Sequence, residues 1–270
     1  MKSVTSFLAL FAALGCALGD KPPPPRSMST KEFRQAFLNA GIIPDVMGSF
    51  NPTVSFYAGY KSGDGNKTLM MPGSKLQLME TKLPFEFSVE NIMNAQNVTR
   101  NTRYILCMIG PDSPTREEPT ERNMRYYLAG NFTVEQTKSE ILSSALIMRN
   151  STPAFNDYMA PDPKSGSGMH RYVYLLYVQP EKMNKMGFDA MGVDMKERKK
   201  FSISQLRKQA GLGRPIGGTF FTVDMAKNSD GGNGGNNGGG NGNGGSTASI
   251  ATVGSIFMFI TLLTTMFVWM

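Results

Sequence analysis

Two short stretches of the chain hold the residues best suited to chemistry, and the first contains its single histidine. Residues 166–179 read GSGMHRYVYLLYVQ, in which His170 is followed by Arg171 and then by an apolar run. In a strand, neighbouring side chains point to opposite faces, so one of this pair faces inward or into a cleft. An inward imidazole can donate to an anion and titrates near neutral pH, whereas an inward guanidinium needs a carboxylate. The pattern alone leaves open a purely structural histidine.

The second stretch, GPDSPTREEP at residues 110–119, directly follows the apolar run 104–109. Its prolines restrict the loop, so Asp112 and Arg116 are held near the end of the expected strand, where binding residues are often found. The spacing is also compatible with an Asp112 that caps a turn and pairs with Arg116. Both interpretations stay open at this point.

Most of the elements that must position these residues read as strands. Short runs rich in aromatic and β-branched residues, separated by Gly, Pro and Asn, predict strands at 53–60, 75–79, 84–89, 104–109, 126–134, 172–179 and 218–223. The runs 104–109 and 172–178 are apolar on both faces, which is typical of central strands covered on both sides. In residues 85–90, apolar and polar side chains alternate with the period expected for a half-buried strand. The chain is therefore expected to be mainly β, packed as sheets.

Two short helices are indicated by their capping residues. Ser29 and Glu32 have the spacing of a capping box, and Gly41 supplies a C-terminal stop. Ser202 and Gln205 repeat this spacing at the start of a second helix. Neither helix is long enough to build a core, so both are expected at the periphery of the sheets.

The two ends of the chain have the composition of targeting segments. Lys2, the apolar run 7–17 and the small residues before Asp20 predict a secretory signal peptide. An uncharged apolar tail that follows small residues predicts a glycosylphosphatidylinositol (GPI) attachment signal, with a tail-anchored protein as the alternative. The expected segments are a signal peptide at 1–19, a Pro-rich spacer at 20–28, the folded domain at 29–227, a Gly/Asn-rich tether at 228–248 and a hydrophobic tail at 249–270, with the anchor on one of Asn243, Gly244, Gly245 and Ser246.

Composition supports an exported protein. Without the signal peptide the chain keeps only Cys107, which excludes a disulfide framework and favours a buried, inert thiol. Sequons for N-glycosylation lie at Asn66, Asn97, Asn131 and Asn150. The chain has 28 Lys+Arg against 21 Asp+Glu, and its one dense basic run, 196–200, contains no aromatic residue, so we read it as a solvated loop and expect no nucleic-acid partner.

Together, four segments resemble the phosphatidylethanolamine-binding protein (PEBP) family. They are GIIPDVMGSFNPTVSFYAGY, GPDSPTREEP, GSGMHRYVYLLYVQ and FSISQLRKQAGLGRPIGGTFF, in this order between residues 40 and 224. The central two are similar to the family's D-P-D-x-P and G-x-H-R motifs. The resemblance implies a β-sandwich of two sheets with a few short peripheral helices. It also implies a small, non-catalytic pocket at one end that takes phosphate-like anions or phospholipid headgroups.

The resemblance also places individual residues. It implies one pocket wall of Pro111, Asp112 and Pro114, a second wall of His170 and Tyr172, and Pro163 in the loop at the mouth. Arg171 would point away and brace the pocket by pairing with a carboxylate, with Asp112 as the first candidate, and Arg116 would be a second brace.

Three departures from the family pattern are visible. Gly110 replaces the first aspartate of the D-P-D-x-P motif, Tyr126 replaces a pocket histidine, and the family's C-terminal helix has no counterpart after residue 225. Anion binding would then depend on His170, Tyr126, Tyr172 and backbone N–H groups.

The function predicted from the sequence is that of a cell-surface, GPI-anchored binding module for a phospholipid headgroup or similar anion. The alternative is an interaction protein that inhibits a protease or kinase through surface loops, by analogy with some members of the family. An enzyme is not expected, because the chain lacks a G-x-S-x-G elbow and one histidine cannot join a metal cluster of the usual His/Cys type. No cofactor or metal is expected either.

Overall fold

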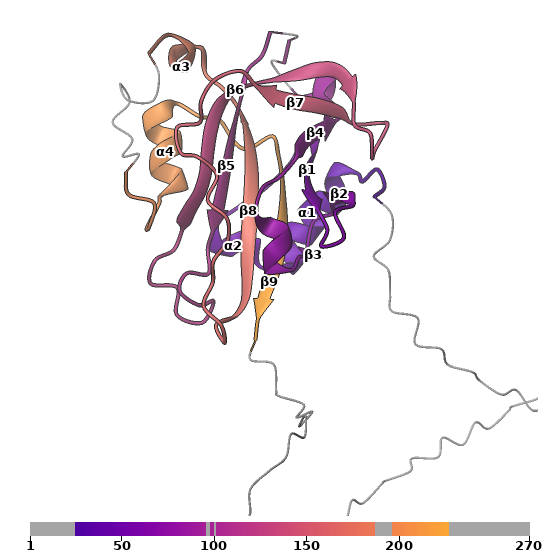
Figure 1. The fold of residues 1–270 in the computed structure, drawn as a ribbon. Coiled ribbons are helices and arrows are strands. Elements are labelled where there is room, and N and C mark those ends of the chain that lie inside the picture. Colours follow the sequence, from indigo (N-terminus) through magenta and orange to yellow (C-terminus); the bar gives the residue numbers. More distant parts are fainter. Residues whose placement is uncertain (1–24, 96–97, 100, 187–195, 227–270) are drawn as a thin grey trace, which may run out of the picture. The chain divides into compact units, whose positions relative to one another are not determined.

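The computed structural model describes residues 25–95, 98–99, 101–186 and 196–226 (Figure 1). The signal peptide, the tether, the hydrophobic tail, Asn97 and the four candidate anchor residues lie outside these described residues, and so does any segment that follows β9 beyond Ala226. In chain order the elements are α1 (Thr30–Asn39), α2 (Ile42–Asp45), β1 (Ser55–Lys61), β2 (Lys67–Met70), β3 (Ser74–Lys75), a 3-10 helix (Leu78–Thr81), β4 (Glu86–Glu90), a second 3-10 helix (Ile92–Asn94), β5 (Tyr104–Gly110), β6 (Met124–Lys138), β7 (Leu146–Asn150), β8 (Gly168–Val178), α3 (Glu181–Met186), α4 (Ile203–Ala210) and β9 (Gly217–Met225).

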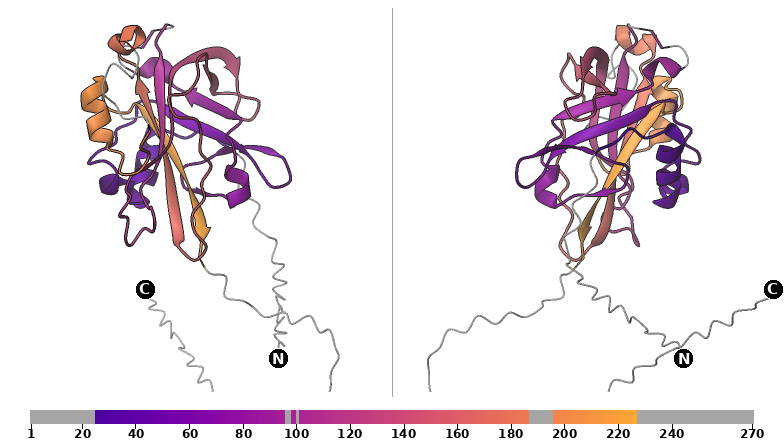
Figure 2. Two further views of the ribbon diagram at one scale, coloured as in Figure 1. Left: turned by 60° about the vertical axis from the view of Figure 1, so that its left-hand side comes forward. Right: turned by 90° about the vertical axis from the view of Figure 1, so that its right-hand side faces the viewer.

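The strands form one hydrogen-bonded sheet in the order β2-β1-β4-β7-β6-β5-β8-β9-β3, which is antiparallel except for the pair β3 and β9. The sheet doubles back, so that β1 and β4 pack over β8 and β9 (Figure 2). Phe87 of β4 lies 5.6 Å from Tyr174 of β8 between ring centroids, and Tyr60 of β1 lies 5.4 Å from Phe221 of β9. The expected mainly β sandwich is therefore confirmed, and its two layers are the two halves of a continuous sheet.

Strands β5 and β8 are the central strands that their apolar sequences predict. All seven residues of β5 and eight consecutive residues of β8 are buried. One face of these strands contributes to the core between the two layers, and the other is covered by α1 and α4. On the second face Phe37 of α1 stacks on Phe50 and meets the ring of Phe220 in β9 edge-on.

Both helices begin where their caps predict. The Ser29 side chain accepts a hydrogen bond from the Glu32 N–H and the Glu32 carboxylate accepts one from the Ser29 N–H, so the capping box of α1 is complete. The chain leaves α1 through Gly41, whose φ of 67° is a left-handed conformation that favours glycine. Ser202 caps α4 in the same way by accepting from the Gln205 N–H.

The strand predictions need correction at three points. Residues 75–79 are not a strand beyond Lys75, because the chain turns into the 3-10 helix at Leu78, where the Glu80 carboxylate accepts a hydrogen bond from the Gln77 N–H. Strands β2 and β7 were not predicted, because both are short and partly polar. Strand β2 has four residues and begins with two polar ones, and β7 has five residues and ends with two polar ones. The polar face of β4 is not solvated: Glu90 is buried and its Oε2 accepts from the Tyr57 hydroxyl at 2.6 Å.

Candidate functional site

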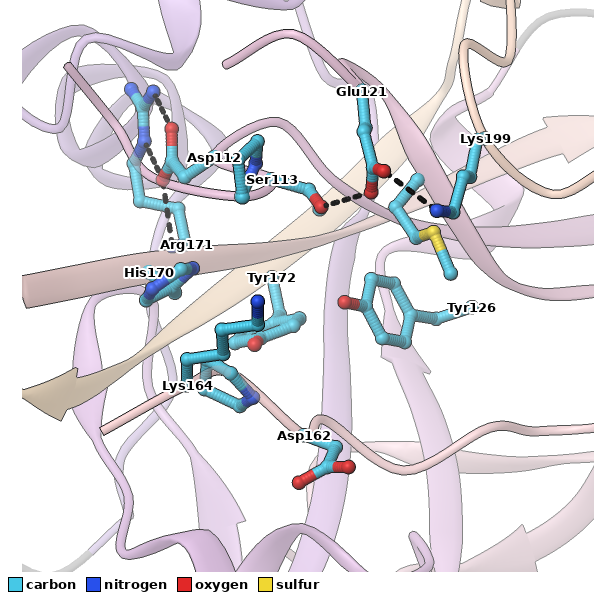
Figure 3. A pocket seen from close by; sticks show the side chains of 14 residues that line it. Asp112, Ser113, Glu121, Tyr126, Asp162, Lys164, His170, Arg171, Tyr172 and Lys199 are labelled. Atoms are coloured by element: carbon cyan, nitrogen blue, oxygen red, sulfur yellow. Dashed lines mark hydrogen bonds and ion pairs between the residues drawn. The ribbon is translucent and has the colours of Figure 1, made fainter. Parts of the chain in front are cut away.

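A pocket of about 300 Å³ opens at the end of the sheet where β5 ends and β6 and β8 begin (Figure 3). Its walls come from the turn after β5, the first residues of β6 and β8, the loop 162–164 and Lys199. Of the predicted site residues, the structure brings together Asp112, Pro114, Tyr126, Pro163, His170, Arg171 and Tyr172 in this lining. Pro111 is buried beside the pocket, where its carbonyl accepts a hydrogen bond from Arg122 Nε at 2.8 Å. Their roles as ligand contacts stay predictions.

Arg171 is the centre of a buried ion-pair network. Asp112 Oδ2 accepts from the Arg171 backbone N–H at 2.8 Å and from its Nε at 2.9 Å, while Asp112 Oδ1 lies 2.6 Å from Nη2. The remaining guanidinium N–H groups reach Asp45 Oδ2 at 2.9 Å and the Ala40 carbonyl at 2.8 Å. Arg171 therefore joins β8 to the turn after β5 and to the junction of α1 and α2. The ion pair between Arg171 and Asp112 that the family resemblance implied is present.

Arg116 does not pair with Asp112. Its Nη2 donates to the Ala40 carbonyl at 3.3 Å, and its side chain is exposed. Asp112 instead has Arg122 as its second cation, with 3.8 Å between Oδ1 and Nη2. Because both Asp112 oxygens are directed at arginines, this carboxylate braces the pocket wall.

His170 is 5% exposed and has a defined partner. Its Nε2 lies 2.7 Å from the Ser167 hydroxyl oxygen, and the Ser167 hydroxyl donates to the Lys164 carbonyl. The Ser167 hydroxyl is therefore shared between the Lys164 carbonyl and His170 Nε2, and the direction of its bond to Nε2 depends on the tautomer of the imidazole. Burial lowers the pKa of His170 and so favours the neutral imidazole. The negative charge of Asp112 opposes this effect but does not outweigh it. The hydrogen bond ties the imidazole to the loop 164–167.

Gly110 and Tyr126 are spatial neighbours. A Cβ built on Gly110 would lie 2.8 Å from Tyr126 Cε2, closer than real contacts allow. The Tyr126 ring also meets the Tyr172 ring edge-on, with centroids 5.1 Å apart. Burial raises the pKa of Tyr126, so its hydroxyl stays protonated at neutral pH. The two departures from the family pattern therefore belong together, because the phenol ring occupies the space that a side chain at position 110 would need.

Several residues that line the pocket were not predicted. Glu121 and Lys199 form an ion pair at 2.6 Å, and Ser113 donates to Glu121 Oε2 at 3.0 Å (Figure 3). Asp162 and Lys164 flank Pro163 at the mouth. Lys199 belongs to the basic run 196–200, which is a loop with exposed side chains except for the half-buried Arg198, as predicted, but its place at the pocket was not predicted.

Arg198 shows why this basic run contacts the fold. Its Nη1 donates to the carbonyls of Arg125 and Tyr126, and the Arg125 N–H in turn donates to the Arg198 carbonyl at 2.7 Å. The run is therefore hydrogen-bonded to the first residues of β6, beside the pocket, where β6 does not pair with β7. The only advance signal was its charge density, which does not distinguish a docked segment from a solvated one.

The charges in the pocket lining are balanced and mostly paired. Three acidic side chains (Asp112, Glu121, Asp162) face three basic ones (Lys164, Arg171, Lys199). The Asp112–Arg171 and Glu121–Lys199 pairs neutralise two of each, which leaves Lys164 as the lining cation and Asp162 as the lining carboxylate without an ion pair in the part of the chain that the structure describes. Within the same residues, no group of three or more His, Cys, Asp or Glu side chains could hold a metal ion.

The sequons differ in their surroundings. Asn66 is exposed in the turn between β1 and β2. Asn150 ends β7, where its Oδ1 accepts from the Thr152 N–H at 2.7 Å. Asn131 is half-buried in β6: its Oδ1 accepts from Arg103 and Gln179, and its Nδ2 donates to Thr152 at 3.1 Å.

Comparison with known proteins identifies the class to which this fold and pocket belong. A model of the phosphatidylethanolamine-binding protein family matches residues 66–221, more than half of the chain. The chain therefore belongs to the phosphatidylethanolamine-binding protein family.

Solved structures of the same fold include two with substantial overlap. The crystal structure of carboxypeptidase Y inhibitor complexed with its cognate proteinase superposes with a TM-score of 0.59 at 21% sequence identity, covering 73% of this chain and 96% of that chain. A phosphatidylethanolamine-binding protein from Plasmodium vivax gives a TM-score of 0.51 at 22% identity, covering 70% of this chain and 95% of that one. At these identities the similarity establishes the fold.

Proposed function

We propose that this protein is a binding module whose pocket takes a small phosphoryl anion, such as a phospholipid headgroup or a free phosphate ester. The observation that carries the proposal is the unpaired Lys164 ammonium at the mouth of a pocket whose wall holds two protonated tyrosines and an imidazole. An ammonium and neutral hydroxyl donors are suited to an anion, since charge-assisted hydrogen bonds are the strong ones.

The test is calorimetric titration of the protein with phosphoethanolamine. Removing the Lys164 ammonium in Lys164→Ala removes one charge-assisted contact, worth about 1.5–3 kcal/mol, and should weaken binding by roughly tenfold or more. His170→Ala should also weaken binding, because it releases the loop 164–167. Lys82→Ala, which removes an exposed ammonium outside the pocket, is the matched control. Equal affinity of Lys164→Ala and Lys82→Ala would refute the pocket assignment.

The pocket geometry supports binding rather than covalent catalysis. Ser167 and His170 have the separation of a nucleophile and its base, but the Ser167 hydroxyl also donates to the Lys164 carbonyl. A serine whose proton is engaged by a backbone carbonyl is not activated as a nucleophile in this arrangement.

We further propose that the protein is exported and held at the outer leaflet by a GPI anchor, which rests on the signal-like residues 1–19 and on the small-residue segment and apolar tail of 242–270. In the part of the chain that the structure describes, no helix is long and apolar enough to cross a membrane. Release from intact cells by phosphatidylinositol-specific phospholipase C is the expected result. Retention after this treatment would instead support a tail-anchored protein.

A second candidate function is inhibition of a protease. It is favoured by one observation, the fold shared with an inhibitor that was crystallised with its cognate proteinase. Residual activity of a panel of secreted serine proteases and carboxypeptidases at micromolar protein is the relevant measurement. Full activity of the whole panel would count against this candidate and leave the binding proposal intact.

A further inference from the structure

The pocket already holds a carboxylate of the chain itself. Glu121 projects into it from the loop that follows β5, and its two oxygens are both engaged by other lining residues (Figure 3). Oε1 lies 2.6 Å from Lys199 Nζ, and Oε2 accepts a hydrogen bond from the Ser113 hydroxyl at 3.0 Å. The three residues come from two separate segments, 113–121 and 199, that meet at the pocket.

A bound phosphoryl group would accept hydrogen bonds from the same donors, Lys199 and Ser113. An ammonium and a hydroxyl are ordinary donors to phosphate oxygens, and they hold a carboxylate by the same charge-assisted hydrogen bonds. The hydrogen bonds from Lys199 and Ser113 lower the pKa of Glu121, so its carboxylate is ionised at neutral pH. An anion in the pocket would therefore both compete with Glu121 for these donors and be repelled by its charge.

The contact can open without disturbing the backbone. The Glu121 and Lys199 side chains keep 30% and 51% of their surface exposed, and exposed ion pairs contribute little to stability. The backbone on either side is held separately, because the Glu121 N–H donates to the Ser113 carbonyl at 3.0 Å and the Lys200 N–H donates to the Glu121 carbonyl at 3.2 Å. Displacement of Glu121 thus requires only that its side chain rotate.

We propose that Glu121 is a specificity-determining residue that occupies the anion subsite formed by Ser113 and Lys199, so that a phosphoryl ligand must displace its carboxylate. This inference rests on the proposed function of the same pocket. With Glu121 in place, Lys164 is the one lining cation left for a ligand among the described residues; once Glu121 is displaced, Lys199 and the Ser113 hydroxyl become available as well. A ligand that carries only a carboxylate repeats the contacts of Glu121 and gains little, whereas a phosphoryl group offers more acceptor oxygens to the same donors.

The test compares Glu121→Gln with the wild-type full-length protein by calorimetric titration with inorganic phosphate, glycerophosphoethanolamine and acetate. Glu121→Gln should bind phosphate about tenfold more tightly, a change of about 1.4 kcal/mol. Glu118→Gln removes the same charge from an exposed position of the same loop and should leave binding unchanged. In Glu121→Gln/Lys199→Ala the gain should disappear, which separates release of Lys199 from new contacts of the glutamine. Acetate should bind none of the variants measurably.

The pattern of outcomes separates this inference from the proposed function. Phosphate binding by the wild type with no gain in Glu121→Gln over Glu118→Gln overturns the role of Glu121 and leaves the pocket assignment standing. Binding by Glu121→Gln alone supports both, with the wild-type pocket closed by its own carboxylate. No binding by any variant, with unchanged thermal unfolding, overturns both. A gain for glycerophosphoethanolamine as well as phosphate assigns the subsite to lipid headgroups, and a gain for phosphate alone assigns it to free phosphate or its monoesters.

Discussion

The buried pair of Asp112 and Arg171 gives the sharpest prediction for stability. Both side chains are almost fully buried, at 0% and 1% exposed, and they are joined by two side-chain hydrogen bonds. We consider Asp112→Asn, which keeps the shape of the side chain and removes its charge. The guanidinium would then be left in the protein interior with Asp45 as its remaining carboxylate.

The size of the expected loss in unfolding free energy follows from the burial of the pair. Removing one partner of a buried ion pair typically costs about 3–5 kcal/mol, because the other charge is left uncompensated. Asparagine can still accept from the Arg171 backbone N–H, and Asp45 Oδ2 stays 2.9 Å from Nη2, so we expect the lower end, about 3 kcal/mol. The Asp45 side chain is 34% exposed, so Asp45→Asn should cost no more than about 1 kcal/mol.

Urea unfolding followed by circular dichroism measures both losses. Asp112→Asn should lower the midpoint with an unchanged m-value, and its melting temperature should fall by roughly 6–12 °C for a domain of this size. Because the Asp112–Arg171 pair is buried away from solvent, the loss of stability in Asp112→Asn should persist in 1 M salt. The smaller loss in Asp45→Asn should decrease in 1 M salt, because Asp45 is partly exposed. The double variant Asp112→Leu/Arg171→Met should recover much of the stability, since it leaves no fully buried charge unpaired; Asp45 and Arg122, which lose a partner, are partly exposed. A loss for Asp112→Asn below 1 kcal/mol, or no larger than that of Asp45→Asn, would refute the assignment of Arg171 as a buried brace.

Three further predictions concern other parts of the molecule. Gly110→Ala should destabilise the protein by about 1–3 kcal/mol through overpacking against Tyr126, and the loss should be smaller in a Tyr126→Leu background, as a double-mutant cycle in urea would measure. Burial raises the pKa of Cys107 to about 12, so the folded protein should not react with Ellman's reagent at pH 8 and should react after denaturation. Asn66 should carry a glycan and the half-buried Asn131 should not, which enzymatic deglycosylation in H₂¹⁸O followed by peptide mass mapping can determine; a glycan on Asn131 would contradict its place in the hydrogen-bond network.

The features that could be predicted from the sequence are those written in local patterns. The caps of α1 and α4 depend on side chains three residues apart, and the burial of β5 and β8 on apolar residues within one run. The segment 75–79 shows the limit of this reasoning. Leu76 and Leu78 alternate with polar residues as in a strand, but the hydrogen bond from Gln77 to Glu80 favours a helical turn instead. When two local signals conflict in so short a segment, the tertiary contacts decide.

The site was predictable where a strand fixes the direction of its side chains. The family resemblance implied the Arg171–Asp112 pair, and the alternation of His170 and Arg171 along β8 was consistent with it; the structure has the pair, although Arg171 also lines the pocket instead of pointing away from it. Glu121 and Lys199 were missed because both lie outside regular elements, and loop side chains converge through contacts that no sequence spacing encodes.

Gly110, Tyr126 and Glu121 together change what the pocket can recognise. The absent carboxylate at position 110 and the absent imidazole at position 126 are explained by one ring that fills both spaces. That ring supplies a neutral hydroxyl in place of a titratable pair, and His170, the remaining imidazole, is hydrogen-bonded to Ser167. The charged groups left to discriminate between ligands are therefore Lys164 and Lys199 as donors, Asp162 at the mouth, and Glu121 as the internal competitor. Anion binding in this pocket should accordingly depend strongly on salt, because its lysines are exposed and screened. It should depend little on pH between 6.5 and 8, once the ionisation of the ligand itself is allowed for. A steep rise in affinity as His170 becomes protonated within that range would show that the imidazole, and not Lys164, is the main anion contact.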